Sequence, residues 1–265
     1  MPERWALPDR DAALNWCAKR NEQGMRCILD VLGRYNRERA QALESYNAYL
    51  DLMGQVKRHR LNAALSIKPS TLGGTMGRDV TQELVRGLCE KGAALGVAIE
   101  MDMEGQRMVD LTLELAEDCA RSGMKPTVAL QAYLHRTPQD VERMLDAGVR
   151  IRLVKGAYTG DVSDFDMISE IFRDLVEQIL SRDVPFCVGT HDPDLLEWVQ
   201  NRVCDHEILE FSFLKGLADG TKGTLVSEGW KVSEYIPFGP HKEGYEARRK
   251  AYLRTLDELG RLPAP

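Results

Sequence analysis

Eight short apolar runs recur along the chain at fairly regular intervals, and helical segments separate them. The runs cover 26–33, 62–68, 96–102, 127–133, 149–156, 184–191, 208–216 and 230–239. Apolar residues at helical spacing fill 39–59, 81–96, 108–123, 140–148, 167–183 and 193–204. Parallel strands need crossover helices, and eight such units close on themselves. The pattern therefore predicts an α/β fold, a (β/α)8 barrel of the TIM type.

Two further helices are expected outside this alternation. Residues 9–23 predict a short amino-terminal helix that caps the bottom or side of the barrel, and residues 242–262 predict a helix after the last strand. No linker or low-complexity tract interrupts the chain, and 265 residues suffice for one large core. We expect residues 1–265 to form a single catalytic domain. Helix boundaries are indicated by Thr137-Pro138, Asp192-Pro193, Gly96, Gly123 and Gly148.

Composition excludes several classes of protein. Hydrophobic residues make up 43% and charged residues 29% of the chain, and no stretch approaches the ~18 apolar residues of a membrane span. The first ten residues, MPERWALPDR, lack an apolar signal segment, so we expect a cytoplasmic protein. The six cysteines form no CxxC pair and are expected to be reduced core thiols. A net charge of -6 argues against nucleic acid, and no histidine pair has metal-ligand spacing, so we expect no metal.

Polar residues end most of the predicted strands. In this fold, catalytic groups stand at the carboxyl ends of strands. A charged group there is costly unless it is paired or binds a ligand, so several converging groups indicate a polar, anionic ligand. These residues are Lys68, Asp102, Glu104, Gln131, Arg152, Lys155, Thr190, His191, Asp192 and Tyr235.

The segment RLVKGAY, at 152–158, ends the fifth predicted strand. Strand alternation places Arg152 and Lys155 on opposite faces, and Gly156 lets the backbone bend close to a ligand. An equally weighted interpretation makes Arg152 and Lys155 structural partners of Asp102 and Glu104 inside the barrel.

An arginine pair, Arg248 and Arg249, lies in the carboxyl-terminal helix. Adjacent helical residues point about 100° apart, so both reach one ligand only if this helix crosses the barrel mouth. They then form a carboxylate clamp; otherwise they belong to a solvated basic face.

The ordered motifs resemble one family. They are LDVLG, SIKPSTLG, IEMDMEG, LQAYLHRT, RLVKGAY, GTHD, EFSFLKGL and EYIPFG followed by YEARR, spanning residues 26–249. Their series resembles proline dehydrogenase, an FAD-dependent enzyme with a distorted (β/α)8 barrel. The resemblance implies an oxidoreductase of proline catabolism.

The resemblance also implies residue roles. The groups that hold the substrate carboxylate would be Lys68, Arg248 and Arg249. The walls around the proline ring would be Tyr158, Leu214 and Tyr235, with Asp102 and Ala157 beside the reacting centre. The flavin contacts would be Gln131, Arg152, Lys155, Gly156, Ala157, Thr190 and His191.

The implied reaction is hydride transfer from C5 of L-proline to flavin N5, which yields Δ1-pyrroline-5-carboxylate. A quinone-type acceptor would then reoxidise the flavin, which implies transient contact with the inner face of a membrane. Tyr235 favours plain proline over hydroxyproline, and other cyclic amines or imino acids are the alternative substrates.

Three positions depart from the family pattern. Arg34 stands where a glutamate usually pairs with a tail arginine, so that Asp30 becomes the alternative partner. Thr159 replaces an aromatic residue near the adenine, and Tyr252 replaces a glutamate. The last two changes keep FMN as the second candidate cofactor after FAD.

Two other functions fit the same residues. One is a barrel lyase in which Lys155 forms a Schiff base with a carbonyl substrate. The other is a non-catalytic barrel that binds an amino acid.

Overall fold

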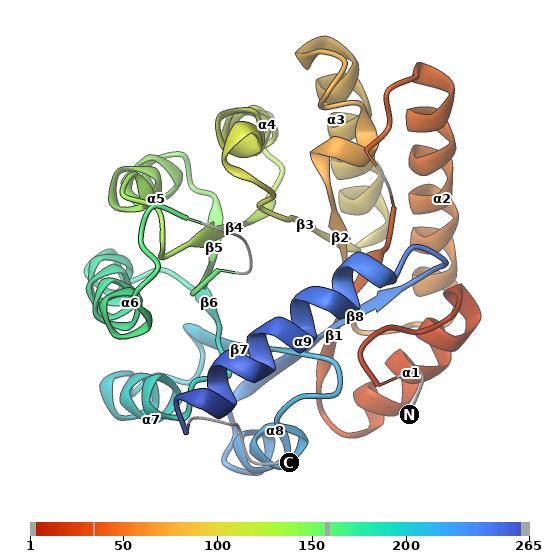
Figure 1. The fold of residues 1–265 in the computed structure, drawn as a ribbon. Coiled ribbons are helices and arrows are strands. Elements are labelled where there is room, and N and C mark those ends of the chain that lie inside the picture. Colours follow the sequence, from red (N-terminus) through yellow and green to blue (C-terminus); the bar gives the residue numbers. More distant parts are fainter. Residues whose placement is uncertain (1–3, 34, 157–159, 261–265) are drawn as a thin grey trace.

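Eight parallel strands pair in chain order and close into a barrel in the computed structural model, which describes residues 4–33, 35–156 and 160–260 (Figure 1). The strands are β1 (Arg26–Val31), β2 (Ala63–Ile67), β3 (Ala98–Met101), β4 (Thr127–Gln131), β5 (Arg150–Val154), β6 (Phe186–Gly189), β7 (Leu209–Leu214) and β8 (Lys231–Phe238). The last strand returns to the first, with Ile28 opposite Tyr235. The predicted (β/α)8 barrel is confirmed.

Helices cover the outside of the barrel, which explains why its strands read as continuous apolar runs. All residues of β2 and β4 are buried, as expected for parallel strands with a helix layer on one face and a filled interior on the other. The helices are α1 (Arg10–Glu22), α2 (Arg39–Arg58), α3 (Arg78–Leu95), α4 (Val109–Arg121), α5 (Thr137–Asp146), α6 (Phe165–Leu180), α7 (Pro193–Arg202), α8 (Asp219–Ser227) and α9 (Glu243–Glu258), with 3-10 turns at Pro69–Leu72 and Gln106–Met108.

Most of the predicted helix boundaries are confirmed. Asp192 caps α7, because its side chain accepts a hydrogen bond from the backbone N–H of Asp194 at 3.1 Å. Gly96 ends α3 at φ 70°, in the left-handed region that favours glycine. The prediction for Thr137 was wrong: Arg136 is the capping residue, and the Thr137 hydroxyl donates to the carbonyl of Gln131 instead.

Helix α8 was not predicted from the sequence. Its segment DGTKGTLVS contains two glycines and only two buried side chains, Lys222 and Leu225, so it lacks an apolar stripe. A buried ionic cluster holds it, together with the packing of Leu225 and Val226 against the core.

This ionic cluster joins α1, α8 and β8. Glu234 accepts hydrogen bonds from Trp16 at 2.6 Å and from Arg20 at 3.1 Å, and it forms an ion pair with Lys222. Arg20 and Lys222 also pair with Asp219, at 2.6 and 2.8 Å. Lys222 and Glu234 are both 0% exposed. The cluster fixes α1 against the side of the barrel, at β1 and β8, as predicted for residues 9–23.

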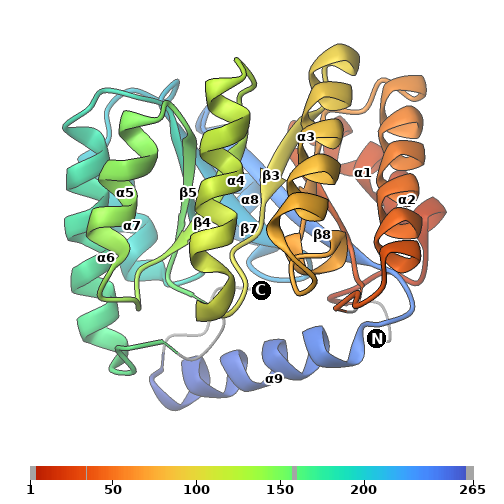
Figure 2. The same cartoon turned by 90° about the horizontal axis from the view of Figure 1, so that it is seen from above.

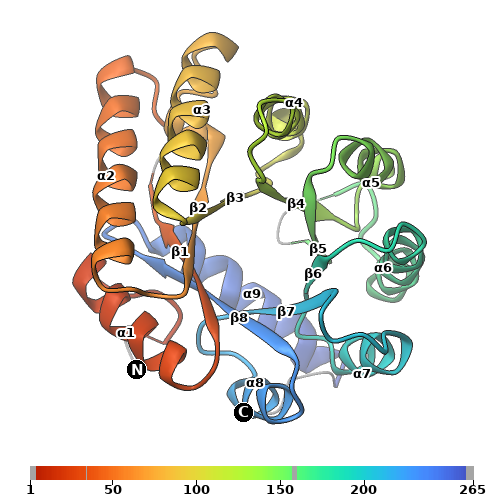
Figure 3. The ribbon, with the colours of Figure 1, turned by 180° about the vertical axis from the view of Figure 1, so that it is seen from behind.

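Helix α9 lies across the end of the barrel at which the strands finish (Figure 2). Seen from the opposite end, it lies behind the strands, so that it covers only one mouth (Figure 3). Its first turn packs through Tyr245 against Ala6 and Leu32, and Leu7 forms a bridge beside Phe238 at the end of β8. The predicted helix over the barrel mouth is therefore confirmed.

The ionic cluster gives a test of stability. We expect Lys222→Met to lower the free energy of unfolding by about 3 kcal/mol, because it leaves a fully buried carboxylate with fewer partners. Urea unfolding followed by circular dichroism measures this loss.

Lys231→Met is the matched control. Lys231 pairs with Glu207 at the surface and its side chain is 44% exposed, so we expect a change within about 1 kcal/mol. Equal losses in the two variants would contradict the importance of the buried pair.

Candidate functional site

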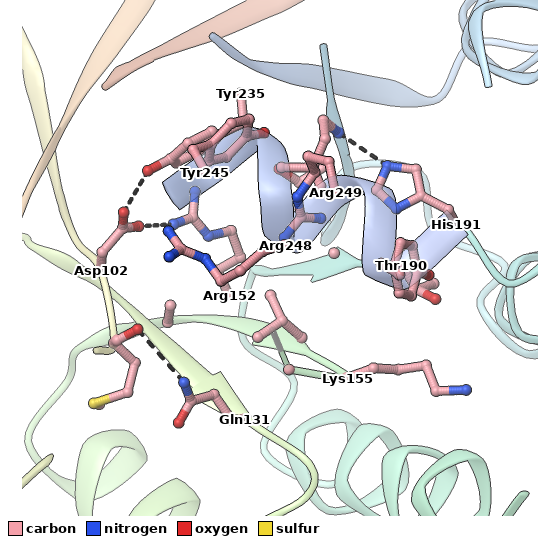
Figure 4. Close-up of a pocket in the computed structure, with 18 of the residues that line it drawn as sticks. Asp102, Gln131, Arg152, Lys155, Thr190, His191, Tyr235, Tyr245, Arg248 and Arg249 are labelled. Atoms are coloured by element: carbon pink, nitrogen blue, oxygen red, sulfur yellow. Dashed lines mark hydrogen bonds and ion pairs between the residues drawn. The ribbon is translucent and has the colours of Figure 1, made fainter. Parts of the chain in front are cut away.

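A cavity of about 590 Å³ opens at the carboxyl ends of the strands, beneath α9 (Figure 4). Its size is typical of small-molecule and cofactor sites. The residues predicted from the sequence that line it are Lys68, Asp102, Glu104, Gln131, Arg152, Lys155, Gly156, Thr190, His191, Leu214, Tyr235, Arg248 and Arg249. Ala157 and Tyr158 lie outside the described residues.

Arg152 points into the barrel, where two carboxylates hold it. Its guanidinium lies 2.8 Å from Glu100 and 2.7 Å from Asp102. The structural pairing considered for Arg152 is therefore present. The pairing considered for Glu104 is not: its carboxylate accepts from the backbone N–H of Ser70 at 2.9 Å and from the Ser70 hydroxyl.

Lys68 belongs to a second network, at the ends of β1, β2, β3 and β8. Its amine pairs with Asp30 and with Asp102, the latter at 3.1 Å, and lies 3.3 Å from the Tyr235 hydroxyl. Tyr235 in turn donates to Asp102. The ammonium group therefore makes two hydrogen bonds and two ion pairs within the protein before any ligand arrives.

The two carboxylates of this network have opposite pKa shifts. Burial raises the pKa of Asp30 despite the neighbouring Lys68. Burial alone would also raise the pKa of Asp102, but Lys68 and Arg152 together lower it below its ordinary value. Asp102 is thus the carboxylate held ionised at the mouth of the barrel.

Lys155 points away from the barrel axis, as strand alternation predicted. Its amine lies 3.0 Å from the carboxylate of Asp192 and 2.7 Å from the Ser169 hydroxyl, and it stands 3.1 Å from the centre of the Phe165 ring. Gly156 follows at φ 122°, where a Cβ would lie 1.7 Å from the Tyr133 ring. The glycine is required because the chain passes this ring closely.

His191 is buried and neutral. The backbone N–H of Leu214 donates to its Nε2 at 3.0 Å, so this nitrogen carries no proton. Burial, with Arg249 and Lys222 nearby, lowers the pKa of His191 to about 3. Thr190 precedes it, and its hydroxyl caps the turn by accepting from the backbone N–H of Asp192 at 3.1 Å.

Gln131 presents an open acceptor to the cavity. Its side-chain nitrogen makes two long hydrogen bonds of 3.4 Å, to the carbonyls of Met103 and Glu104. Within the described ranges, its side-chain oxygen accepts no hydrogen bond from the protein. The oxygen is therefore available to a donor on a ligand.

Arg248 and Arg249 reach the cavity from α9 (Figure 4). Arg249 is only 6% exposed, its Nε has no hydrogen-bond partner, and in the part of the chain that the structure describes it forms no ion pair. Arg152 and Lys68 are each neutralised by carboxylates. Among the described residues, Arg249 is thus a buried cation at this mouth without a carboxylate partner, which fits an anionic ligand.

Two residues of the site were missed as functional positions, and the partner expected for a third was wrong. Asp30 was considered as a partner of a tail arginine, but it pairs with Lys68. Glu100 is a buried acid inside an apolar run, which implies a cation nearby. Tyr245 lines the cavity and lies one helical turn before Arg249. The i, i+4 spacing of Tyr245 and Arg249 was the signal available for it.

Among the described residues, no three acidic, cysteine or histidine side chains converge as a metal-binding group. All six cysteines are free, and five are buried; Cys204 is exposed, so the core prediction was wrong for it. No helix in the described ranges has the length and hydrophobicity to cross a membrane.

The shifted pKa of His191 predicts a pH effect. In the unfolded chain this histidine binds a proton near its ordinary pKa of 6.5, whereas in the folded protein it does so only near pH 3. Its contribution to stability is therefore complete above pH 6.5 and is lost as the pH falls toward 3, by up to about 1.4 kcal/mol per pH unit. NMR of histidine-labelled protein should show His191 neutral at pH 5.

The same NMR titration in urea is the control, because the unfolded His191 should then gain its proton near pH 6.5. Protonation of His191 near pH 6.5 in the folded protein would contradict the buried, neutral assignment.

Comparisons with known proteins agree with this geometry. Residues 13–161 match the family model of proline dehydrogenase. Proline dehydrogenase 1 of Bacillus subtilis strain 168 is 27% identical over 250 residues, covering 91% of this chain and 82% of that protein. Proline dehydrogenase of Deinococcus radiodurans is 28% identical over 267 residues, covering 93% of this chain and 86% of that protein.

A solved structure shares the fold. Proline utilization A (PutA) from Bdellovibrio bacteriovorus, inactivated by N-propargylglycine, superimposes with a TM-score of 0.85 at 21% identity. The match covers 93% of this chain and 32% of the PutA chain, so the present chain spans about a third of that protein. The matched family model and the barrel together show that this chain belongs to the proline dehydrogenase family.

Proposed function

We propose that this protein is a flavin-dependent dehydrogenase that oxidises L-proline to Δ1-pyrroline-5-carboxylate. Its family and its named relatives support the substrate. The observation that carries the proposal is the buried guanidinium of Arg249, which has no acid beside it in the described structure and lines a cavity at the strand ends. Such a cation suits the carboxylate of a small amino acid.

The residues around the cavity fit a flavin. A flavin ring has a polar edge with N–H donors and carbonyl acceptors. Gln131 offers an unoccupied oxygen, Arg152 offers a fixed guanidinium, and the Gly156 backbone passes the cavity closely. Thr190 and His191 complete the proposed contacts, together with Lys155 and Ala157. FAD is the first candidate and FMN the second; when bound, the flavin supplies a hydride acceptor at N5.

The protein's own groups would bind and orient the substrate. Arg248 and Arg249 would hold the carboxylate, with Lys68 as the third cation once it exchanges one of its present contacts. The side chains of Tyr158, Leu214 and Tyr235 would pack around the proline ring. Holding the ring in one orientation over its acceptor lowers the entropic part of the barrier.

The cations around the substrate favour the neutral, reactive form of its amine. The ring nitrogen must lose its proton before it assists hydride loss, and nearby cations disfavour the ammonium form. Asp102 remains ionised, but Arg152, Lys68 and Tyr235 already satisfy it. The charge of Arg249, which has no acid beside it among the described residues, therefore dominates at the substrate.

Further parts of the proposal rest on the family resemblance. Residues 1–265 would form one catalytic domain in the cytoplasm, peripheral at the inner face of a membrane where a quinone-type acceptor removes the electrons. The Tyr235 hydroxyl donates to Asp102, and a tyrosine rather than a smaller residue at this position would favour proline over hydroxyproline.

The Schiff-base alternative is less well supported. The amine of Lys155 lies in a buried ion pair with Asp192. Such a pair stabilises the ammonium form, which is not nucleophilic.

The first test is spectroscopic. We expect the purified protein to be yellow and its band near ~450 nm to bleach when L-proline is added without oxygen, because the flavin accepts the hydride. Visible absorption measures both.

Pyrrolidine, which is the same ring without the carboxylate, is the control and should bleach the band much more slowly. A flavin that proline does not bleach would overturn proline as the substrate. A colourless protein that takes up no added FAD or FMN would overturn the flavin.

Arg249→Met tests the carboxylate site. We expect KM for proline to rise roughly 30-fold or more, because a buried charge-assisted contact is lost, with flavin content unchanged. Steady-state kinetics and the ratio of flavin to protein absorbance measure the two quantities.

Arg254→Met is the matched control, since Arg254 lies on the same helix and is exposed. Loss of flavin in Arg249→Met would argue that Arg249 holds the cofactor rather than the substrate.

A further inference from the structure

The carboxyl-terminal helix places two tyrosines on either side of Arg249. Tyr245, Arg249 and Tyr252 follow one another at i, i+4 and i+7, so they share one face of α9. All three line the cavity. The face of α9 that covers the barrel mouth thus carries an arginine between two tyrosines.

Two aromatic rings lie against the Arg249 guanidinium. Its Cζ lies 5.2 Å from the centre of the Tyr245 ring and 5.7 Å from that of the Tyr252 ring. Both distances are within the range of cation–π interactions. Its Nε is buried and has no hydrogen-bond partner among the described residues, so the two rings take the place of a polar partner there.

The other buried arginines in the described ranges are held differently. Arg20 pairs with Asp219 and Glu234, and Arg152 pairs with Glu100 and Asp102. Those carboxylates neutralise the guanidinium that they hold. An aromatic face attracts a cation without carrying a net charge, so it fixes the group and leaves its charge uncompensated.

Tyr252 also connects Arg249 to the end of β6. Its ring meets the His191 ring edge-on, with 6.1 Å between the ring centres. His191 is fixed in turn, because its Nε2 accepts a hydrogen bond from the backbone N–H of Leu214. The Tyr252 ring therefore packs against a side chain that the barrel holds in place. Figure 4 shows His191 and Arg249 on the same side of the cavity.

We infer that Tyr252 is a positioning residue, which together with Tyr245 holds Arg249 between two rings so that its full charge is available to the substrate carboxylate. This inference rests on the proposed function and deepens it. In this inference Tyr252 acts through its ring and not through its hydroxyl. The binding of the substrate carboxylate, rather than of the rest of the substrate, then depends on Tyr252.

Three substitutions of Tyr252 separate the ring from the other properties of the side chain. Tyr252→Phe keeps the ring, Tyr252→Leu removes it, and Tyr252→Glu gives Arg249 a neutralising carboxylate. Ala247→Glu adds the same negative charge to an exposed position of α9 and serves as the control. Each variant is purified with its cofactor, and the flavin content and thermal midpoint show whether it folds.

The main measurement is the binding of tetrahydrofuran-2-carboxylate by calorimetry. This ring-oxygen isostere of proline has the carboxylate but no amine. We expect Tyr252→Phe to bind it within about twofold of the wild type, Tyr252→Leu about tenfold more weakly, and Tyr252→Glu more weakly still, with Ala247→Glu unchanged. KM for proline should rise in parallel, while KM for L-prolinamide, which has no charge at this position, should change little.

Equal binding of the isostere by the wild type and by Tyr252→Leu would overturn the inference. So would a loss in Tyr252→Phe as large as that in Tyr252→Leu, because the hydroxyl would then carry the effect. Equal losses for proline and prolinamide would show that Tyr252 only packs the cavity. The proposed function fails in a different way, if the wild type itself neither binds the isostere nor is reduced by proline.

Discussion

The interior of a closed barrel of eight strands is a packed core, so each charge inside it needs a partner of opposite sign there. Alternate strands supply such charges here: Arg26, Glu100, Arg152 and Glu210 come from β1, β3, β5 and β7. Arg26 lies 2.9 Å from both acids, and Arg152 lies 2.8 Å from Glu100. The layer that branched apolar residues usually fill in such barrels is an ion-pair chain in this one. Its upper end is Asp102, so the position of this carboxylate at the mouth depends on pairs far below it.

The site has two parts that differ in their charge balance. The strand ends carry cations that carboxylates already neutralise, such as Lys68 beside Asp30 and Lys155 beside Asp192. Helix α9 adds Arg249, which two aromatic rings hold. The paired charges at the strand ends are fixed in position and nearly neutral as a group. The charge of Arg249 supplies the attraction for an anion. In the proposed reaction, the strand ends hold the cofactor, and Lys68 at the end of β2 joins the two arginines of α9 in holding the substrate carboxylate.

The sequence predicts the barrel well because burial on both faces gives strands that read as apolar runs, such as AALSI in β2. It predicts many of the residues that line the cavity because polar residues end most of the strands, and alternation gives the opposite directions of Arg152 and Lys155 correctly. Helix α8 could not be predicted because its sequence has no apolar stripe; the buried ion pair of Lys222 helps to hold it in place. The sequence also does not predict which residues the buried charges contact. The register between strands decides that Arg152 pairs with Glu100 and that Glu104 bonds to Ser70.

Helix α9 both covers the cavity and carries the charge that the strands do not balance. Withdrawal of this helix would therefore expose the mouth to water and remove the cation in a single motion. The rate at which a ligand leaves and the strength with which it is held then depend on the same element. Residence time can change through substitutions in α9 alone, while the strand ends that surround the reacting atoms stay as they are.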